Sequence, residues 1–312
     1  MKKLGKGTLG LIILSLFIST SYAQTNVYQV LASYGKILVQ KTDGAQWVPI
    51  ATGNELIQSD MLKVAEDAYL GLIGNNGNTL ELNKQGTYKV SDLTGGFSAS
   101  SGATQKYAAL VLSDMTNTND QSYMYNMTVT GALERSVTNN MLQAYMPRTT
   151  NLLKDEVTFS WFNFKDAEEY VFTLTDRYAR RITQKYVRDT LITINLEDLD
   201  LKDENCYYWA VSSKENPKIK SEEYCIYKLS EKARVAIRDT LDTLNKDFGE
   251  NKTALNCLIL ASFYEKNNLL NEAMVSYEDA ISKAPQVEEY KKSYALFLIR
   301  IGLFDEARKL WD

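Results

Sequence analysis

The chain has 312 residues, with 35 Lys and Arg against 39 Asp and Glu, and its formal net charge is −4. An acidic chain without a block of basic residues is a poor match for nucleic acid or for an anionic membrane surface. Histidine is absent from the whole sequence. That absence excludes Ser-His-Asp and Cys-His catalysis, His-bearing zinc sites and histidine pH switches.

Residues 1–23 have the pattern of a secretory signal peptide: a lysine-rich head, an apolar run over 9–18, and a small-x-small end over 21–23. The alternative is an uncleaved anchor, but the run is shorter than the roughly 20 residues that span a bilayer. We expect cleavage after Ala23 and export to the periplasm, with outer-membrane association or secretion as further fates. Gln24 rather than Cys follows the cut, which argues against a lipid anchor. Loss of three lysines takes the net charge to about −7, and the remaining length predicts two or more domains.

Residues 27–93 consist of short alternating runs separated by turn residues, such as Gly-Asn-Asn-Gly-Asn at 74–78. Alternation predicts strands, and Asn-Gly pairs favour hairpin turns. The order of the motifs resembles the FecR-like β domain of bacterial envelope proteins: a Trp-containing strand at 46–50, G-x-x-L at 53–56, D-x-L-x-V at 60–64 and L-x-L at 80–82. The resemblance implies a small β domain outside the membrane that takes part in protein contacts.

Residues 94–146 form the predicted linker, which is rich in Gly and Ser at 94–104 and has the composition of a short helix at 105–115. A second β domain is predicted over 147–229, beginning at Pro147. Its runs F-x-W (159–161), Y-x-x-x-L (170–174) and Y-Y-W-A-V (207–211) are similar to fibronectin and immunoglobulin-type modules of envelope proteins. Several short strands with turns between them predict a β-sandwich.

The chain has three cysteines. Residues 214–217 have the composition of a hairpin loop, and pairing Ser213 with Lys218 would set Cys206 opposite Cys225. Opposed residues lie about 4.5–5.5 Å apart between Cα atoms, which suits a disulfide. We predict this bond; the alternative is two buried thiols on opposite sheet faces, one residue out of register. Cys257 falls at a packing position of the helical region and is expected to be an unpaired core residue.

Residues 230–312 have helical periodicity. A leading helix is predicted over 230–248, with Ser230 as N-cap and Gly249 as terminator, and we expect the following helices to stack on it. Residues 254–286 predict two helices with a break at 266–269, and a second, partial unit begins at Glu288. The spacing resembles the tetratricopeptide repeat (TPR), and the matching residues are Leu260, Ala261, Tyr264, Ala273, Tyr277, Ala280 and Pro285.

In this resemblance the concave side of the helices, called here the inner face, holds the partner-binding residues. Two readings remain open at this point: a partner's peptide or helix occupies the inner face, or the preceding helix fills it within the chain. The register assigns ten residues to the inner face: Leu255, Leu258, Ser262, Glu265, Lys266, Glu289, Lys292, Leu296, Ile299 and Arg300.

The predicted fold class is multidomain, β then α: a small β domain, a β-sandwich and a C-terminal TPR-like helical repeat. No cofactor or metal motif is present, so we expect a non-enzymatic periplasmic adaptor that binds envelope proteins through its helical tail. The alternative is a module that binds glycan or cell wall through exposed aromatics of the β domains, which the 20 tyrosines would permit.

Overall fold

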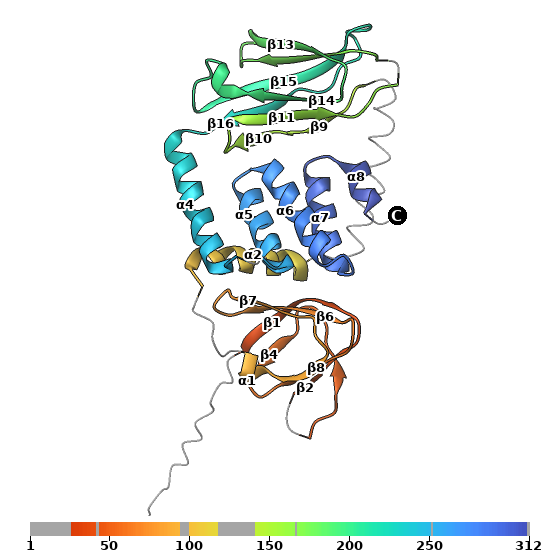
Figure 1. Ribbon diagram of the computed structural model, residues 1–312, viewed down its shortest axis with the longest axis vertical. Helices are drawn as coiled ribbons and strands as arrows, with labels where there is room; N and C mark the ends of the chain where they lie inside the picture. Colours follow the sequence, from red (N-terminus) through yellow and green to blue (C-terminus); the bar gives the residue numbers. More distant parts are fainter. Residues whose placement is uncertain are drawn as a thin grey trace, which may run out of the picture.

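The computed structural model describes residues 26–41, 44–93, 100–117, 141–165, 167–250 and 252–310. The predicted signal peptide and residues 118–140 lie outside the described residues. Figure 1 shows three layers along the long axis: a β domain, a layer of helices and a β-sandwich. The predicted fold class, β then α, is confirmed along the chain. In space, however, the helices lie between the two β domains.

The first β domain contains two antiparallel four-stranded sheets, ordered β4-β1-β6-β7 and β3-β2-β5-β8. Its core holds fully buried residues from both sheets, including Val30, Leu62 and Leu72. The predicted turn at 74–78 joins β6 to β7, with Gly77 at φ 80°. The elements are β1 (Asn26–Tyr34), β2 (Ile37–Gln40), β3 (Val48–Pro49), β4 (Glu55–Ile57), β5 (Met61–Val64), β6 (Tyr69–Gly74), β7 (Thr79–Leu82), β8 (Gly86–Lys89) and the short helix α1 (Val90–Leu93).

The second β domain is the predicted sandwich, with a three-stranded sheet β14-β11-β9 and a five-stranded sheet β10-β16-β15-β12-β13. Phe159 lies between the sheets, 4.8 Å from the ring of Phe172 and 5.2 Å from that of Trp209. Strand β9 and buried Leu142 precede Pro147, so the sandwich begins earlier than predicted. Its strands are β9 (Ala144–Met146), β10 (Thr150–Leu152), β11 (Glu156–Trp161), β12 (Tyr170–Thr175), β13 (Arg181–Val187), β14 (Leu191–Asn195), β15 (Asn205–Ser213) and β16 (Tyr224–Lys228).

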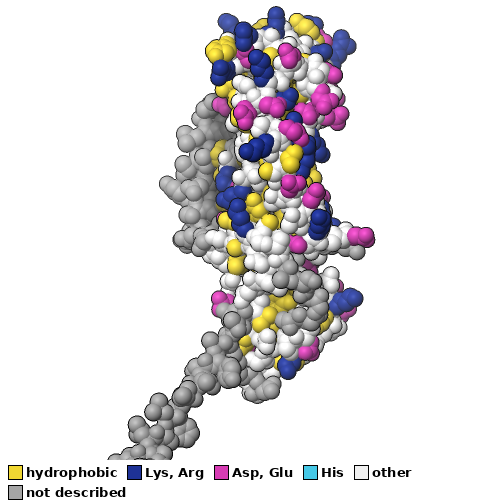
Figure 2. Space-filling model, turned by 90° about the vertical axis from the view of Figure 1, so that its left-hand side faces the viewer, with side chains coloured by type: hydrophobic (Ala, Val, Ile, Leu, Met, Phe, Trp, Pro, Cys, Tyr) yellow, Lys and Arg dark blue, Asp and Glu magenta, His cyan; other side chains and the backbone are white. Residues whose placement is uncertain are grey.

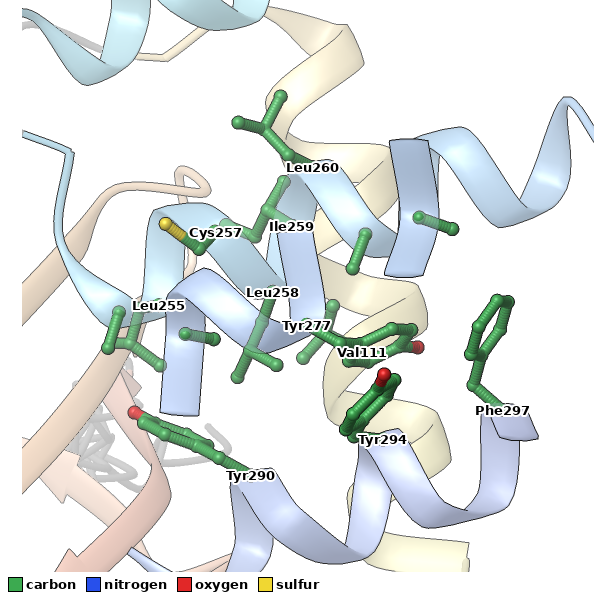
Figure 3. Packing of buried hydrophobic residues seen from close by; sticks show 14 of the residues in the cluster. Val111, Leu255, Cys257, Leu258, Ile259, Leu260, Tyr277, Tyr290, Tyr294 and Phe297 are labelled. Carbon is green, nitrogen blue, oxygen red and sulfur yellow. The ribbon is translucent and has the colours of Figure 1, made fainter. Parts of the chain in front are cut away.

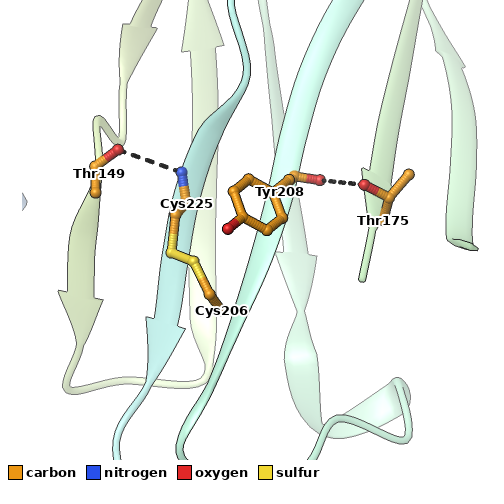
Figure 4. The surroundings of a disulfide bond; sticks show 5 residues. All are labelled: Thr149, Thr175, Cys206, Tyr208 and Cys225. Atoms are coloured by element: carbon orange, nitrogen blue, oxygen red, sulfur yellow. Dashed lines mark hydrogen bonds between the residues drawn. A yellow bond between two sulfur atoms is a disulfide. The ribbon is translucent and has the colours of Figure 1, made fainter. Parts of the chain in front are cut away.

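The predicted disulfide between Cys206 and Cys225 is present, with a Cα separation of 5.7 Å (Figure 4). The predicted register is wrong, because Cys206 is opposite Tyr227 and Cys225 is opposite Tyr208. The two cysteines are therefore diagonal neighbours on one face. The loop is longer than predicted, and Ser212 bridges Lys220 across it. A disulfide of this kind persists in oxidising compartments.

The helical layer contains α2 (Gly102–Asn117), α4 (Glu231–Phe248), α5 (Ala254–Lys266), α6 (Leu270–Lys283), α7 (Glu288–Arg300) and α8 (Phe304–Lys309). Helices α5 and α6 form a hairpin, and α7 and α8 form a second one beside it (Figure 1). Ala261, Ala273 and Ala280 are completely buried. Their small side chains let the helices approach closely, as their spacing predicted. Cys257 is a buried free thiol, also as predicted.

The leading helix α4 packs on the core of the helical layer through Leu244, Ile237 and Leu241, as predicted, but it contributes less to that core than expected. Gly249 ends it with φ 71°, as predicted, but Leu244 is its only buried residue and Ala236 is exposed. Helix α2, from the predicted linker, crosses the other helices and supplies Tyr107 and Val111 to the same core (Figure 1). The sequence did not reveal this part of α2, because periodicity alone does not say which amphipathic helix a given surface receives.

Candidate functional site

Helix α2 lies against the predicted inner face. Tyr107 and Val111 of α2 are each 6% exposed and belong to the same core as Leu258. The Tyr107 ring meets Phe263 edge to face at 5.2 Å. Figure 3 shows Val111 among the residues of α5, α6 and α7, beside Tyr277.

Little space remains between α2 and the helices that it crosses. A hollow of only about 20 Å³ is lined by Val111 and Asp114 of α2 together with Leu258, Ser262, Tyr277, Ser293, Leu296 and Arg300. That volume holds about one water molecule. The structure thus shows the inner face filled from within the chain, by α2 rather than by the preceding helix α4.

The ten predicted inner-face residues have different environments. Leu258, Ser262, Leu296 and Arg300 line the contact with α2. Leu255 and Glu289 instead contact the first β domain. Leu255 packs against Gly71 so closely that a Cβ atom added to this glycine would lie 3.3 Å from Leu255 Cδ1. Glu289 Oε1 accepts a 2.9 Å hydrogen bond from the Thr52 hydroxyl. The other four comprise exposed Lys266 and half-buried Glu265, Lys292 and Ile299.

A charged cluster lies at the end of the inner face near the α5–α6 turn. The Arg300 guanidinium donates two hydrogen bonds to the Glu265 carboxylate, at 2.8 and 2.9 Å, and the Tyr277 hydroxyl donates a third at 3.1 Å. Burial opposes the charge on Arg300, but the hydrogen bonds to Glu265 and the negative charge of Glu265 outweigh it and raise the pKa of Arg300. On α2, burial raises the pKa of Asp114 against the attraction of Arg300. Glu265 and Arg300 are therefore satisfied within the chain.

The first turn of α2 is attached to helix α4 and to the first β domain. Asp247 of α4 accepts hydrogen bonds from the Ser101 backbone N–H at 2.8 Å and from the Thr104 hydroxyl at 2.6 Å. Burial opposes ionisation of Asp247, but these hydrogen bonds outweigh it and lower its pKa. On the other side, the Ser100 hydroxyl donates to the Asn76 carbonyl of the β6–β7 hairpin. These contacts fix where α2 begins.

The first β domain docks on the N-terminal ends of α5 and α7. The Tyr69 and Tyr290 hydroxyls share a buried hydrogen bond of 2.7 Å, and burial raises the pKa of both. Figure 3 shows the Tyr290 ring beside Leu255. Glu81 accepts a 2.9 Å hydrogen bond from the Leu255 backbone N–H. This places a carboxylate at the positive end of the α5 dipole.

The sandwich docks at the opposite end of the same helices. Strand β10 holds the α5–α6 turn: the Asn151 backbone N–H donates to the Asn268 carbonyl at 2.7 Å, and its side-chain amide donates to the Asn267 carbonyl at 2.8 Å. The Thr150 hydroxyl accepts from the Leu270 N–H at 3.0 Å. These bonds satisfy backbone groups that helix ends leave unpaired. The helices therefore link the two β domains through specific contacts at both ends.

Two larger clefts flank the helical layer. One of about 450 Å³ lies between the start of the sandwich and the outer side of α5 and α6, where Val275 is 56% exposed. The other, of about 510 Å³, lies between Arg148, Phe162 and α8. Within the described ranges, no three Cys, Asp or Glu side chains come together as metal ligands. Those ranges also contain no helix with the length and hydropathy of a bilayer span.

Sequence reasoning missed the role of α2, although it predicted the helix. The available signal was the apolar pair Tyr107 and Val111, four residues apart, with Ala108 beside Tyr107. Such a pair lies on one helix face and requires a partner surface. A run of linker composition on each side obscured that signal.

No protein-family model matches the chain, and no curated protein matches its sequence. Structural similarity extends to a crystal structure of chicken CNTN1 FN1-FN3 domains, with 9% identity and a TM-score of 0.19, over 66% of this chain and 62% of that one. A cytokine receptor complex matches with 11% identity and a TM-score of 0.17, over 63% of this chain and 91% of the receptor chain. At these TM-scores neither likeness bears on the fold or function of this chain.

Proposed function

We propose that the protein is a non-enzymatic adaptor of the bacterial cell envelope, with a TPR-like helical layer that binds an amphipathic segment of an envelope protein on its inner face. The observation that carries the proposal is α2 itself. The inner face accepts an amphipathic helix, through Leu258 and Leu296 on its side and Tyr107 and Val111 on the helix. Helix-in-groove binding uses such apolar anchors at i and i+4 spacing.

The compartment in the proposal comes from the signal-peptide pattern of residues 1–23, the FecR-like order of strand motifs and the disulfide between Cys206 and Cys225. The mode of binding comes from the TPR-like spacing of Ala261 and the residues that follow it. The proposal further assigns α2 the part of an internal competitor: an incoming segment replaces it. The affinity of the partner is then reduced by the fraction of molecules in which α2 is docked.

Site-specific photo-crosslinking in the periplasm tests this function, with the photoreactive residue at position 299, on the rim of the inner face. Val111→Asp, which weakens α2 docking and leaves the inner face intact, should raise the yield of the partner crosslink. Leu296→Ala, which removes an anchor from the inner face, should lower it. Ala109→Asp adds the same charge at an exposed position of α2 and should change nothing.

Opposite responses to the two variants support an inner-face binding mode, because general destabilisation would move both yields the same way. A crosslink at position 299 that is unaffected by either variant, or the absence of any crosslink there, would refute it. A crosslink to wall polysaccharide instead of protein would favour a glycan-binding module.

A further inference from the structure

The β12–β13 hairpin at the outer end of the sandwich is strongly basic in an acidic protein. Residues 176–188 carry five cations, Arg177, Arg180, Arg181, Lys185 and Arg188, against the single carboxylate of Asp176. Figure 2 shows Lys and Arg side chains gathered at this end of the molecule. A local excess of one sign on a chain of opposite net charge attracts a partner of the other sign.

Some of these cations are neutralised within the sandwich. Arg180 forms an ion pair with Asp176, and Glu169 lies between Arg188 and Lys214. Within the part of the chain that the structure describes, Arg177, Arg181 and Lys185 have no carboxylate partner. Their charge is therefore available to another molecule.

Two of the most exposed aromatic residues lie in this hairpin, Tyr178 in its turn and Tyr186 near the end of β13. Tyr178, 64% exposed, has the Arg177 and Arg180 guanidinium groups 4.9 and 5.4 Å from its ring centre. Tyr186, 61% exposed, has the Lys214 ammonium at 5.5 Å. Exposed Tyr and Arg side chains are enriched among residues that dominate protein interfaces.

Strand β13 also has one backbone edge that no described strand covers. Among the strands that the structure describes, it is the last of the five-stranded sheet, and its one partner there is β12. Its register is regular from Thr183 to Val187, and the irregularity lies at the turn end, beside Arg181. In an antiparallel pair every second residue directs its N–H and C=O away from the partner strand. The regular part of β13 therefore offers donors and acceptors to an added strand.

The unpaired cations lie on both faces of this edge. Arg181 pairs with Thr175 and Tyr186 pairs with Val171, which places both side chains on one face of the sheet. Lys185 pairs with the buried Phe172 and therefore lies on the other face. An added strand would meet a cation on each face. A second copy of β13 would bring like charges together, and lipid or polysaccharide would leave the backbone edge unused.

We propose that β13 is the docking strand for an acidic, extended segment of a partner protein, which adds to the free edge of the five-stranded sheet. Main-chain hydrogen bonds supply affinity in this mode, and the side chains of the added strand supply specificity. Arg177, Arg181 and Lys185 select carboxylates, and Tyr186 packs against a side chain of the incoming strand. This surface is separate from the inner face of the helical layer.

The test measures binding of the chain from Gln24 onward to a short labelled peptide of Glu, Thr and Val by fluorescence anisotropy. R177S/R181S/K185S should weaken binding about 5- to 100-fold, as expected for three exposed ion pairs. K63S/K232S/K283S removes the same charge from exposed positions elsewhere and should stay within about twofold. Equal melting temperatures of the two triple variants would exclude unfolding as the cause.

The backbone part of the proposal has its own control. Two N-methylated versions of the peptide keep every charge. One carries N-methyl groups on the odd-numbered residues and the other on the even-numbered residues, so each version lacks the N–H donors along one edge of the added strand. One version should bind like the parent and the other should lose binding. The docking-strand assignment would be overturned if the two methylated peptides bound equally well or if the unmethylated peptide did not bind. It would also be overturned if vesicles of anionic lipid, or polygalacturonate, bound with the same dependence on the three cations.

Discussion

Val111→Asp is the substitution that should separate α2 from the helices beneath it. Val111 is 6% exposed in the seam with Leu258 and Leu296. Removing its apolar surface costs about 1.5–2 kcal/mol. The new carboxylate would be buried beside Asp114, and the nearby Arg300 guanidinium is already held by Glu265. We expect a total loss of about 3 kcal/mol, limited by the free energy with which α2 docks.

Ala109→Asp is the matched control, since it places the same charge on an exposed position of α2. Its cost should be only the helix-propensity difference, about 0.6 kcal/mol. Urea denaturation followed by far-UV circular dichroism measures both variants. Val111→Asp should also lose helical signal before the main transition, because a free helix of this length is marginal in water. Equal small effects of the two substitutions would refute the packing of α2 described here.

Four further results follow from the buried tyrosine pair, the buried thiol and the disulfide. Tyr290→Phe leaves the Tyr69 hydroxyl unpaired and should cost about 1–3 kcal/mol; the Tyr69→Phe/Tyr290→Phe double variant should cost less than the sum of the single ones. Because burial raises the pKa of both tyrosines, stability should be full below about pH 10 and fall as the pH rises further; a flat alkaline stability curve would contradict this. Burial raises the pKa of the Cys257 thiol to about 11, so a thiol reagent should label it only after unfolding; rapid labelling of the native chain would show that the helical core is open. Reduction of Cys206–Cys225, 19 residues apart, should lower sandwich stability by about 3 kcal/mol, and a reduced chain with unchanged melting would contradict that loop-closure estimate.

The sequence was most informative where a local pattern determines the local structure. The hairpin at 74–78, the end of α4 at Gly249 and the burial of Ala261, Ala273 and Ala280 all depend on the conformations or volumes of a few residues. The disulfide pair was predictable because two cysteines of one hairpin lie close in several registers. The register itself was not predictable, because it depends on the length of the loop before Lys220.

The candidate site was less predictable, because it depends on contacts between distant segments. Leu255 and Glu289 belong to helix positions assigned to the inner face, yet they contact the first β domain through Gly71 and Thr52. Helical register gives the direction of a side chain but not the identity of the segment that meets it. The docking of α2, more than 130 residues before α5 in the chain, is the same kind of long-range choice.

The contact of α2 with the inner face of α5 and α7 determines whether that face is filled within the chain. Hydrogen–deuterium exchange of the chain from Gln24 onward measures it directly, in peptides that cover residues 102–117. We predict exchange around Tyr107 and Val111 that is slower by orders of magnitude than in an unfolded peptide, and faster exchange there in Val111→Asp. Exchange of these residues at the rate of an isolated, fraying helix would contradict the account.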